Sequence, residues 1–253
     1  VMVTRSLLVV DSASPGRRRV LSGARLVMVL AACAAGPTAS QCLPAWDRSI
    51  PEAHVSQDRV AAAREAVRQQ RYVRALDNLR ITQSESTKVS ALVLDAMLLR
   101  ASVCEQIGEW GPARVLYAAA QGTAEALGDE ASLKTARLGE ARMCAIEGNR
   151  QKVTALLQFP EVKDAAERDE LDARFLYAEG RRWQMKRKNF KALPVYKQFR
   201  DAAKSPPLQA LAWLRVAECE GDRYVEPVAG AYRKVLELAP ESRWAQLASR
   251  QLG

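Results

Sequence analysis

One recurring pattern restricts the fold of this chain more than any other feature: two helical segments joined by a glycine. The pattern is clearest in residues 94–120, LDAMLLRASVCEQIGEWGPARVLYAAA. We expect the first helix to end at about Ile107, because Gly108 readily adopts the positive φ that follows many helix C-termini. Trp110 then begins the second helix. The segment therefore predicts a helical hairpin.

Small side chains lie where the two helices of this hairpin would meet. In the second helix, Ala113, Tyr117 and Ala120 follow one another at steps of four and three residues, which places them on one face. Ala101 in the first helix and Ala113 in the second allow the two backbones to approach closely. Trp110 and Tyr117 are expected to fill the space around them.

Two neighbouring segments carry parts of the same pattern. Upstream, QQRYVRALDNL repeats the second helix, with Gln70 in place of the glycine. Downstream, EARMCAIEGNRQKVTALL repeats both helices, with Arg150 where the aromatic residue is expected. The residues of these segments that fall in register are Tyr72, Ala75, Leu79, Ala141, Gly148, Val153 and Leu157.

The C-terminal part of the chain carries two further copies. In GRRWQMKRKNFKALPVYKQFR, residues 180–200, Gly180 is the expected turn glycine, and the copy then needs an insertion and a second helix that contains Pro194. In LAWLRVAECEGDRYVEPVAGAYRKVLELAPES, Tyr232 and Pro240 fall in register near the end. The final segment, RWAQLASRQL, is expected to form a helix that covers the last hairpin.

The clearest hairpin resembles the tetratricopeptide repeat. The pattern of that family has a small residue in the first helix, a turn glycine, an aromatic residue that opens the second helix, an alanine three residues later and an aromatic residue four beyond. The residues that match it at these offsets are Ala101, Gly108, Trp110, Ala113 and Tyr117.

The resemblance implies an all-α fold, an α-solenoid of about five hairpins over residues 57–253 with a C-terminal capping helix. The composition agrees with this expectation. Hydrophobic residues make up 48% of the chain but aromatic residues only 6%, which favours helices packed through small side chains over sheets.

Residues 1–32 have the order of an export signal. Arg17, Arg18, Arg19 and Arg25 precede a short apolar run that ends at Ala32, and small residues follow. A run this short does not cross roughly 30 Å of hydrocarbon as a helix. The segment RRRVLS also resembles a twin-arginine signal, so a lipoprotein signal and a twin-arginine signal both fit.

The sequence LAAC, residues 30–33, resembles the lipobox of bacterial lipoproteins. The resemblance implies cleavage before Cys33, a diacylglycerol on its thiol and, with Ala34 following, sorting to the outer membrane. An uncut leader, or cleavage after TAS at 38–40, is the alternative. Residues 33–56, rich in Pro, Ser and Ala, are expected to form a flexible tether between the anchor and the folded part.

The sequence shows no pattern for catalysis or for cofactor binding. Its one histidine, His54, lies in the expected tether, so no rigidly held catalytic triad or histidine–cysteine zinc site is available. No glycine pattern for phosphate or dinucleotide binding occurs. We therefore expect neither an enzyme nor a protein with a cofactor, a metal ion or a small-molecule substrate. Cys104 and Cys144 are expected to be small buried side chains, although a disulfide between neighbouring hairpins is the alternative.

Residues 180–200, the basic segment, contain eight basic residues and no acidic one, in a chain of net charge +9. Like charges repel one another, so the basic segment is a candidate surface for an acidic peptide terminus or for anionic headgroups. A solvated face with local ion pairs is the alternative. The candidate binding residues are Arg181, Arg182, Lys186, Arg187, Lys188, Lys191, Lys197 and Arg200.

These features favour a non-catalytic scaffold for protein–protein interactions. The chain looks like the repeat-containing lipoproteins of the bacterial envelope that assist assembly of membrane complexes. The resemblance implies an envelope protein or peptide as partner and membrane attachment through the lipid, and export would separate the protein from nucleic acid. The alternative is a cytoplasmic adaptor or a nucleic-acid-associated regulator with a misassigned N-terminus.

Overall fold

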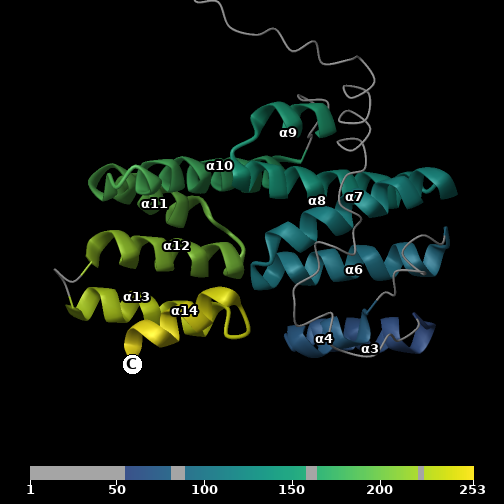
Figure 1. Ribbon diagram of the computed structural model, residues 1–253, viewed down its shortest axis with the longest axis horizontal. Coiled ribbons are helices and arrows are strands. Elements are labelled where there is room, and N and C mark those ends of the chain that lie inside the picture. Colours follow the sequence, from purple (N-terminus) through teal and green to yellow (C-terminus); the bar gives the residue numbers. More distant parts are fainter. Residues whose placement is uncertain (1–54, 81–88, 158–163, 222–224) are drawn as a thin grey trace, which may run out of the picture. The chain divides into compact units, whose positions relative to one another are not determined.

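The computed structural model describes residues 55–80, 89–157, 164–221 and 225–253, and within these ranges the chain forms helices and no strand (Figure 1). The prediction of an all-α fold is confirmed for this part of the chain. The predicted signal, Cys33, His54 and nearly all of the predicted tether lie outside the described residues.

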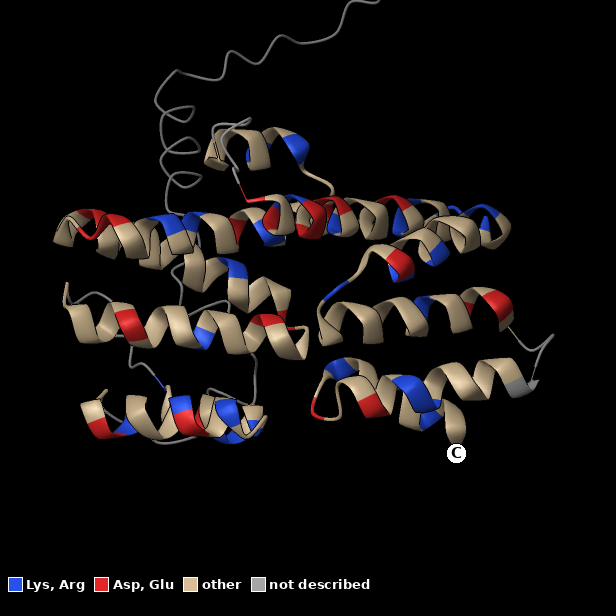
Figure 2. Cartoon of the chain, turned by 180° about the vertical axis from the view of Figure 1, so that it is seen from behind, with Lys and Arg blue, Asp and Glu red and all other residues tan. Residues whose placement is uncertain are grey.

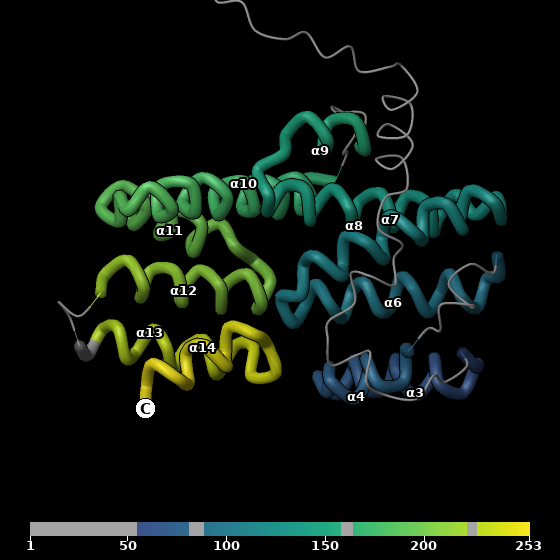
Figure 3. The backbone as a smooth tube through the Cα atoms, in the orientation of Figure 1, coloured from purple at the N-terminus to yellow at the C-terminus, as the bar shows by residue number. Residues whose placement is uncertain are grey.

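Eleven helices follow one another in the described ranges (Figures 1 and 3). They are α3 (Gln57–Arg68), α4 (Tyr72–Asn78), α6 (Ala91–Ile107), α7 (Trp110–Leu127), α8 (Glu130–Glu147), α9 (Arg150–Leu157), α10 (Ala165–Met185), α11 (Asn189–Ala202), α12 (Pro206–Glu220), α13 (Val225–Leu238) and α14 (Arg243–Leu252).

Helices that are neighbours in the sequence pack against each other, as short connections between amphipathic helices require. Such contacts join α3 to α4, α6 to α7, α7 to α8, α8 to α9, α10 to α11, α11 to α12, α12 to α13 and α13 to α14. Helices further apart in the chain also touch: α4 with α6, α6 with α8, α8 with α10, and α12 with α14. The described part is therefore a set of neighbouring helical pairs.

The φ angle is positive at several turns between packed helices. It is 57° at Gln70, 85° at Gly108, 67° at Gly128, 79° at Gly148 and 55° at Arg187. Gln70, Gly108, Gly148 and Arg187 are 38, 40 and 39 positions apart (70 to 108, 108 to 148, 148 to 187), and Gly128 lies midway between Gly108 and Gly148. Gln70 thus replaces the glycine of this turn without changing its conformation, as the sequence pattern predicts.

The prediction that Gly180 is the turn glycine of the fourth hairpin is wrong. Gly180 lies inside α10, and a Cβ added there would come within 2.5 Å of the Tyr196 ring on α11. The glycine therefore allows α10 and α11 to approach closely, and Arg187 forms the turn. Counted from Arg187, Ala192 and Tyr196 fall at the offsets of the hairpin in residues 94–120, so no insertion is needed.

The residues that the repeat pattern selects occupy different environments. Ala75, Ala101, Ala113, Tyr117, Ala141 and Tyr232 are buried. Tyr72 and Trp110 are half-buried, and Pro240 is exposed in the turn between α13 and α14. Arg150, which stands in place of an aromatic residue, lies with its guanidinium carbon 4.2 Å from the centre of the Phe175 ring. The aromatic group at this contact comes from α10 instead of α9.

Two contacts join the C-terminal helices to earlier ones. The carboxylate of Glu241, in the turn before α14, accepts hydrogen bonds from the backbone N–H groups of Tyr72 and Val73 at the start of α4, at 2.5 and 3.2 Å. The Trp244 ring of α14 covers Gly108, where an added Cβ would lie 2.3 Å from it. Residues from opposite ends of the described chain are therefore in direct contact.

Replacement of Arg187 by glycine should stabilise the protein. A left-handed conformation costs a non-glycine residue about 1–2 kcal/mol, which exceeds the extra entropy that glycine loses on folding, about 0.5–1 kcal/mol. We expect the free energy of unfolding in urea to rise by about 0.5–1 kcal/mol. Gly128→Ala is the control and should lower the free energy of unfolding. Its φ angle is 67° and no atom lies within 4 Å of an added Cβ, so only backbone strain changes. An Arg187→Gly variant that is no more stable than the unchanged chain would contradict this account.

Candidate functional site

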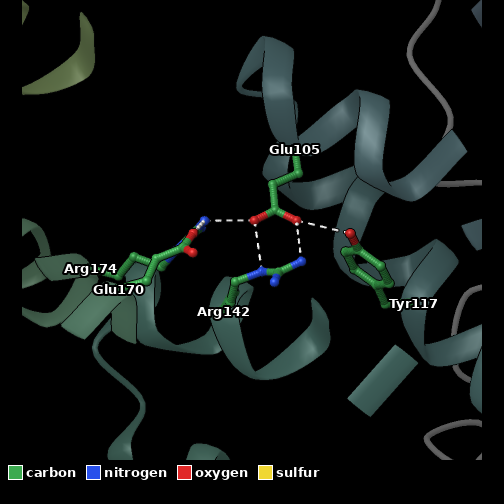
Figure 4. A network of polar contacts seen from close by, with 5 residues as sticks. All are labelled: Glu105, Tyr117, Arg142, Glu170 and Arg174. Carbon is green, nitrogen blue, oxygen red and sulfur yellow. Dashed lines mark hydrogen bonds and ion pairs between the residues drawn. The ribbon is translucent and has the colours of Figure 1, made fainter. Parts of the chain in front are cut away.

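A buried carboxylate on α6 joins four helices (Figure 4). Glu105 is 8% exposed and accepts a 2.9 Å hydrogen bond from the Tyr117 hydroxyl of α7. Two atoms of the Arg142 guanidinium, on α8, lie 3.0 and 3.1 Å from its oxygens. The Nη2 atom of Arg174, on α10, lies 2.6 Å from Oε1 of Glu105. The same atom lies 2.5 Å from Oε1 of Glu170. These five residues, the ion network, therefore tie α6, α7, α8 and α10 together.

The surroundings of Glu105 fix its charge. Burial alone would raise its pKa, but attraction to Arg174 and Arg142 and hydrogen bonds from Tyr117 and Arg142 hold the pKa below the usual value. Burial and the Glu105 charge both raise the pKa of Tyr117, so its hydroxyl remains a donor. Burial lowers the pKa of Arg142, but the Glu105 carboxylate outweighs this effect and raises it. Glu105 and Arg142 therefore stay charged and Tyr117 stays protonated near neutral pH.

A pocket of about 150 Å³ lies beside the ion network. Side chains at or near α6, α7, α8, α10, α12 and α14 line it, so segments far apart in the sequence build it together. Its walls combine charged, hydroxyl, amide and aromatic groups. They are Ser102, Glu105, Gln106, Trp110, Arg142, Glu170, Arg174, Ser205, Pro207, Leu208 and Trp244.

Two tryptophans form the aromatic wall of the pocket. The ring centres of Trp110 and Trp244 are 4.9 Å apart, and Trp110 also meets Tyr177 edge-on at 5.4 Å. Gly108 permits this packing, because any side chain there would collide with Trp244. The turn glycine thus serves both the end of α6 and the placement of α14.

Three buried donors on residues that line the pocket have no acceptor within the described residues. They are the Nε and Nη1 groups of Arg174 and the indole N–H of Trp244. Arg174 is 3% exposed and Trp244 4% exposed, and buried donors of this kind are usually hydrogen-bonded. These three nitrogen atoms are themselves shielded from solvent, so they do not define a contact for a ligand.

The basic segment divides into two parts by its ion pairs. Figure 2 colours the lysines and arginines of the chain, including those of α10 and α11. Lys197 pairs with Glu220 at 3.0 Å, and Arg200 pairs with Asp201 at 2.8 Å, so these two candidates have partners within the protein. The other six lie at the end of α10, in the turn and at the start of α11, and are exposed, with no ion pair among the described residues. They are Arg181, Arg182, Lys186, Arg187, Lys188 and Lys191.

The described residues hold no cluster of histidine, cysteine and acidic side chains that would bind a metal ion. Cys104 and Cys144 are buried thiols and do not form the alternative disulfide. Burial raises the pKa of the Cys144 thiol, and burial together with Glu218 raises that of Cys219 to about 11, which makes both poor nucleophiles at neutral pH. Within the described ranges, no helix combines the length and the apolar character needed to cross a membrane.

Comparison of the chain with family models, with curated proteins and with solved structures gives no match. The interpretation of the site therefore rests on its geometry. Charged and aromatic walls around a small pocket are suited to holding a ligand.

Sequence reasoning did not select Glu105, Arg142, Arg174 or Trp244. Arg142 and Arg174 lie 37 and 69 positions from Glu105 in the chain, so no local spacing connects them. The available signal was weak: Glu105 is an acidic residue three positions before a turn glycine, next to the apolar residues Val103 and Cys104. A charge at such a position indicates a buried partner, but not which one.

Glu105→Gln should destabilise the protein strongly. Removal of one member of a buried ion network leaves the other charges uncompensated, so we expect a loss of about 3–5 kcal/mol in the free energy of unfolding. Glu125→Gln is the matched control, because its 3.1 Å pair with Arg137 is exposed and should matter by less than about 1 kcal/mol. Similar small losses in both variants would contradict the role given to Glu105.

The same pair of variants tests the charge of Glu105. Its pKa is lower in the folded state than the ordinary value of 4.5, so its contribution is complete above that value and is lost as the pH falls through the folded pKa. The stability difference between the unchanged chain and Glu105→Gln should therefore be constant near neutral pH and shrink in acid. Urea unfolding at a series of pH values measures it. A difference that grows toward low pH would have the wrong sign.

Proposed function

We propose that this protein is a non-catalytic scaffold for protein–protein interactions, built as a tetratricopeptide-like solenoid. In this proposal the five hairpins are α3–α4, α6–α7, α8–α9, α10–α11 and α12–α13, and α14 is the cap. The recurring positive-φ turns and the buried small residues support it. The spacing of 38–40 residues between the turns of successive hairpins exceeds the 34 of the family; between Gly108 and Gly148 it is filled by α7 and α8, which have 18 residues each.

The pocket beside the ion network is the observation that carries this proposal. Its volume of about 150 Å³ is below the range of about 300–1,000 Å³ that is typical of drug-sized ligands and cofactors. One side chain or one chain end of a peptide fits such a space. The guanidinium groups of Arg142 and Arg174, which line the pocket, would attract the carbonyl or carboxylate oxygens of the peptide. The proposed ligand is therefore a segment of a partner protein.

We further propose that the protein acts in the bacterial envelope as a lipoprotein anchored through Cys33, where it assists assembly of a membrane complex. The order of arginines, apolar residues, small residues and cysteine in residues 17–33 supports this location. A periplasmic partner bound in the pocket would then be held close to the membrane in which it assembles.

Filling the pocket should abolish partner binding. Ser102 lines the pocket and is half-buried, so Ser102→Phe would place a ring in the space that the peptide needs. Crosslinked pull-down from native membranes should recover the partner with the unchanged chain and lose it, by more than about tenfold, with this variant. The matched control is Ser249→Phe, which adds the same ring on an exposed position of α14. Equal recovery by a folded Ser102→Phe variant would show that the pocket is not the binding site.

The lipid anchor has a separate test. Mass spectrometry of the membrane-extracted protein should find an acylated N-terminus at Cys33, and Cys33→Ala should move the protein from the membrane fraction to the soluble fraction. An intact peptide spanning residues 30–35 as the main form would exclude the anchor. It would leave the cytoplasmic adaptor as the better account of the same fold.

A further inference from the structure

The turn between α10 and α11 exposes two large apolar side chains. Met185 is 75% exposed and Phe190 is 73% exposed, the highest values among the large hydrophobic residues that the structure describes. Met185 is the last residue of α10, and Phe190 is the second residue of α11. Both therefore project from the same turn, residues 181–191, which we call the α10–α11 tip.

The α10–α11 tip is also strongly basic. It contains six lysines and arginines and no acidic residue. Three lysine ammonium groups lie 4.9–6.0 Å from the centre of the Trp183 ring, which gathers them around one aromatic side chain. They belong to Lys186, Lys188 and Lys191. The nearby carboxylate of Glu218 accepts a hydrogen bond from Gln184 of the tip. It forms an ion pair with Arg215 at 2.6 Å, and not with the three lysines.

Folding explains only the cations at the C-terminal end of α10, Arg182 and Lys186, which complement the dipole of that helix. Lys188 is the N-cap of α11 without a side-chain hydrogen bond, and the first turn of α11 holds no acidic residue. Cations at this end of a helix oppose its dipole, and Arg187 occupies the left-handed conformation that favours glycine. Two bare apolar side chains add unfavourable exposure. The tip combines features that a partner, and not the fold, would compensate.

We propose that the α10–α11 tip binds an anionic lipid surface. Met185 and Phe190 enter the boundary between headgroups and acyl chains, while the six cations contact lipid phosphates. An acidic peptide would satisfy the cations but would leave the two exposed apolar side chains unexplained. A membrane surface uses both kinds of group at once. This inference does not rest on the function proposed for the pocket, which lies at other residues.

Sedimentation of the full chain with vesicles tests the charges of the tip. Vesicles of phosphatidylcholine alone are compared with an equal mixture of phosphatidylcholine and phosphatidylglycerol. A variant with three reversals in the tip should bind the mixed vesicles at least about tenfold more weakly than the unchanged chain. Its changes are Lys186→Glu, Lys188→Glu and Lys191→Glu.

A matched control carries the same change in net charge elsewhere. It reverses exposed basic residues on α4, α8 and α14, namely Arg74→Glu, Lys134→Glu and Arg250→Glu. The comparison of the two variants is the readout, because the apolar run that ends at Ala32 belongs to both variants and contributes equally to their binding. Equal binding by the tip variant and the control would overturn the proposal, as would equal binding of the unchanged chain to both kinds of vesicle.

A second pair of variants tests the contribution of the two apolar side chains. Met185→Ser with Phe190→Ser should weaken binding to the mixed vesicles by about tenfold, since buried apolar area is lost. The control is Val89→Ser with Leu252→Ser, two apolar residues that are 56% and 38% exposed outside the tip. Circular dichroism and urea unfolding show that each variant remains folded.

Binding to soluble poly-glutamate distinguishes an acidic polypeptide from a membrane surface as the partner of the tip. The proposal expects Met185→Ser with Phe190→Ser to reduce vesicle binding and to leave poly-glutamate binding unchanged. A variant that keeps full vesicle binding would instead identify the tip as a purely electrostatic site for acidic chains, and the lipid proposal would be withdrawn. Arg187→Gly, expected to be stable, should weaken vesicle binding by about fivefold through the loss of one charge.

Discussion

The carboxylate of Glu105 is the interaction on which the arrangement of the central helices depends. Burial of a negative charge costs roughly several kcal/mol of desolvation free energy. Only cations and hydrogen-bond donors close to the charge offset this cost. Here they come from α7, α8 and α10, so the charge is stable only when all of these helices are in place. Apolar contacts tolerate small shifts of one helix against another. A carboxylate with two guanidinium partners and one hydroxyl donor at defined distances does not.

The pocket follows from this arrangement and from the path of the last helix. The ion network places Arg142 and Arg174 along one side of the space, and Trp244 of α14 closes another side against Trp110. Gly108 makes the second contact possible, since a side chain at that turn would displace the indole ring. A polar wall and an aromatic wall therefore meet at a site that none of the hairpins forms alone.

The parts of the fold that could be predicted from the sequence are those with local causes. The hairpin in residues 94–120 carries its helix ends, its turn and its buried face within one short segment, and the structure has them at these positions. Gly180 misled the same reasoning, because glycine serves turns and close helix contacts alike and only the position of Tyr196 distinguishes the two. The turn at Arg187 was not predicted, because a non-glycine residue occupies its positive-φ position.

The candidate site depends on contacts that the sequence does not encode locally. Glu105 meets Arg174 across 69 positions, and Trp244 reaches a turn in the first half of the chain. The basic segment was recognisable from composition, but its division into ion-paired and unpaired residues depends on Glu220 of α12, which the pattern of charges did not connect to Lys197. Local chemistry can thus predict elements and a charged surface, but not which side chains face each other.

The bond between Glu241 and the start of α4 changes how such a chain comes apart. In an open array of repeats each unit touches only its neighbours, so the terminal units fray first and the middle persists. Here the backbone N–H groups of Tyr72 and Val73 are held by a residue 168–169 positions away. Opening the start of α4 therefore also releases the turn before α14, which couples these two segments, and a native contact with so long a sequence separation is of the kind that slows folding.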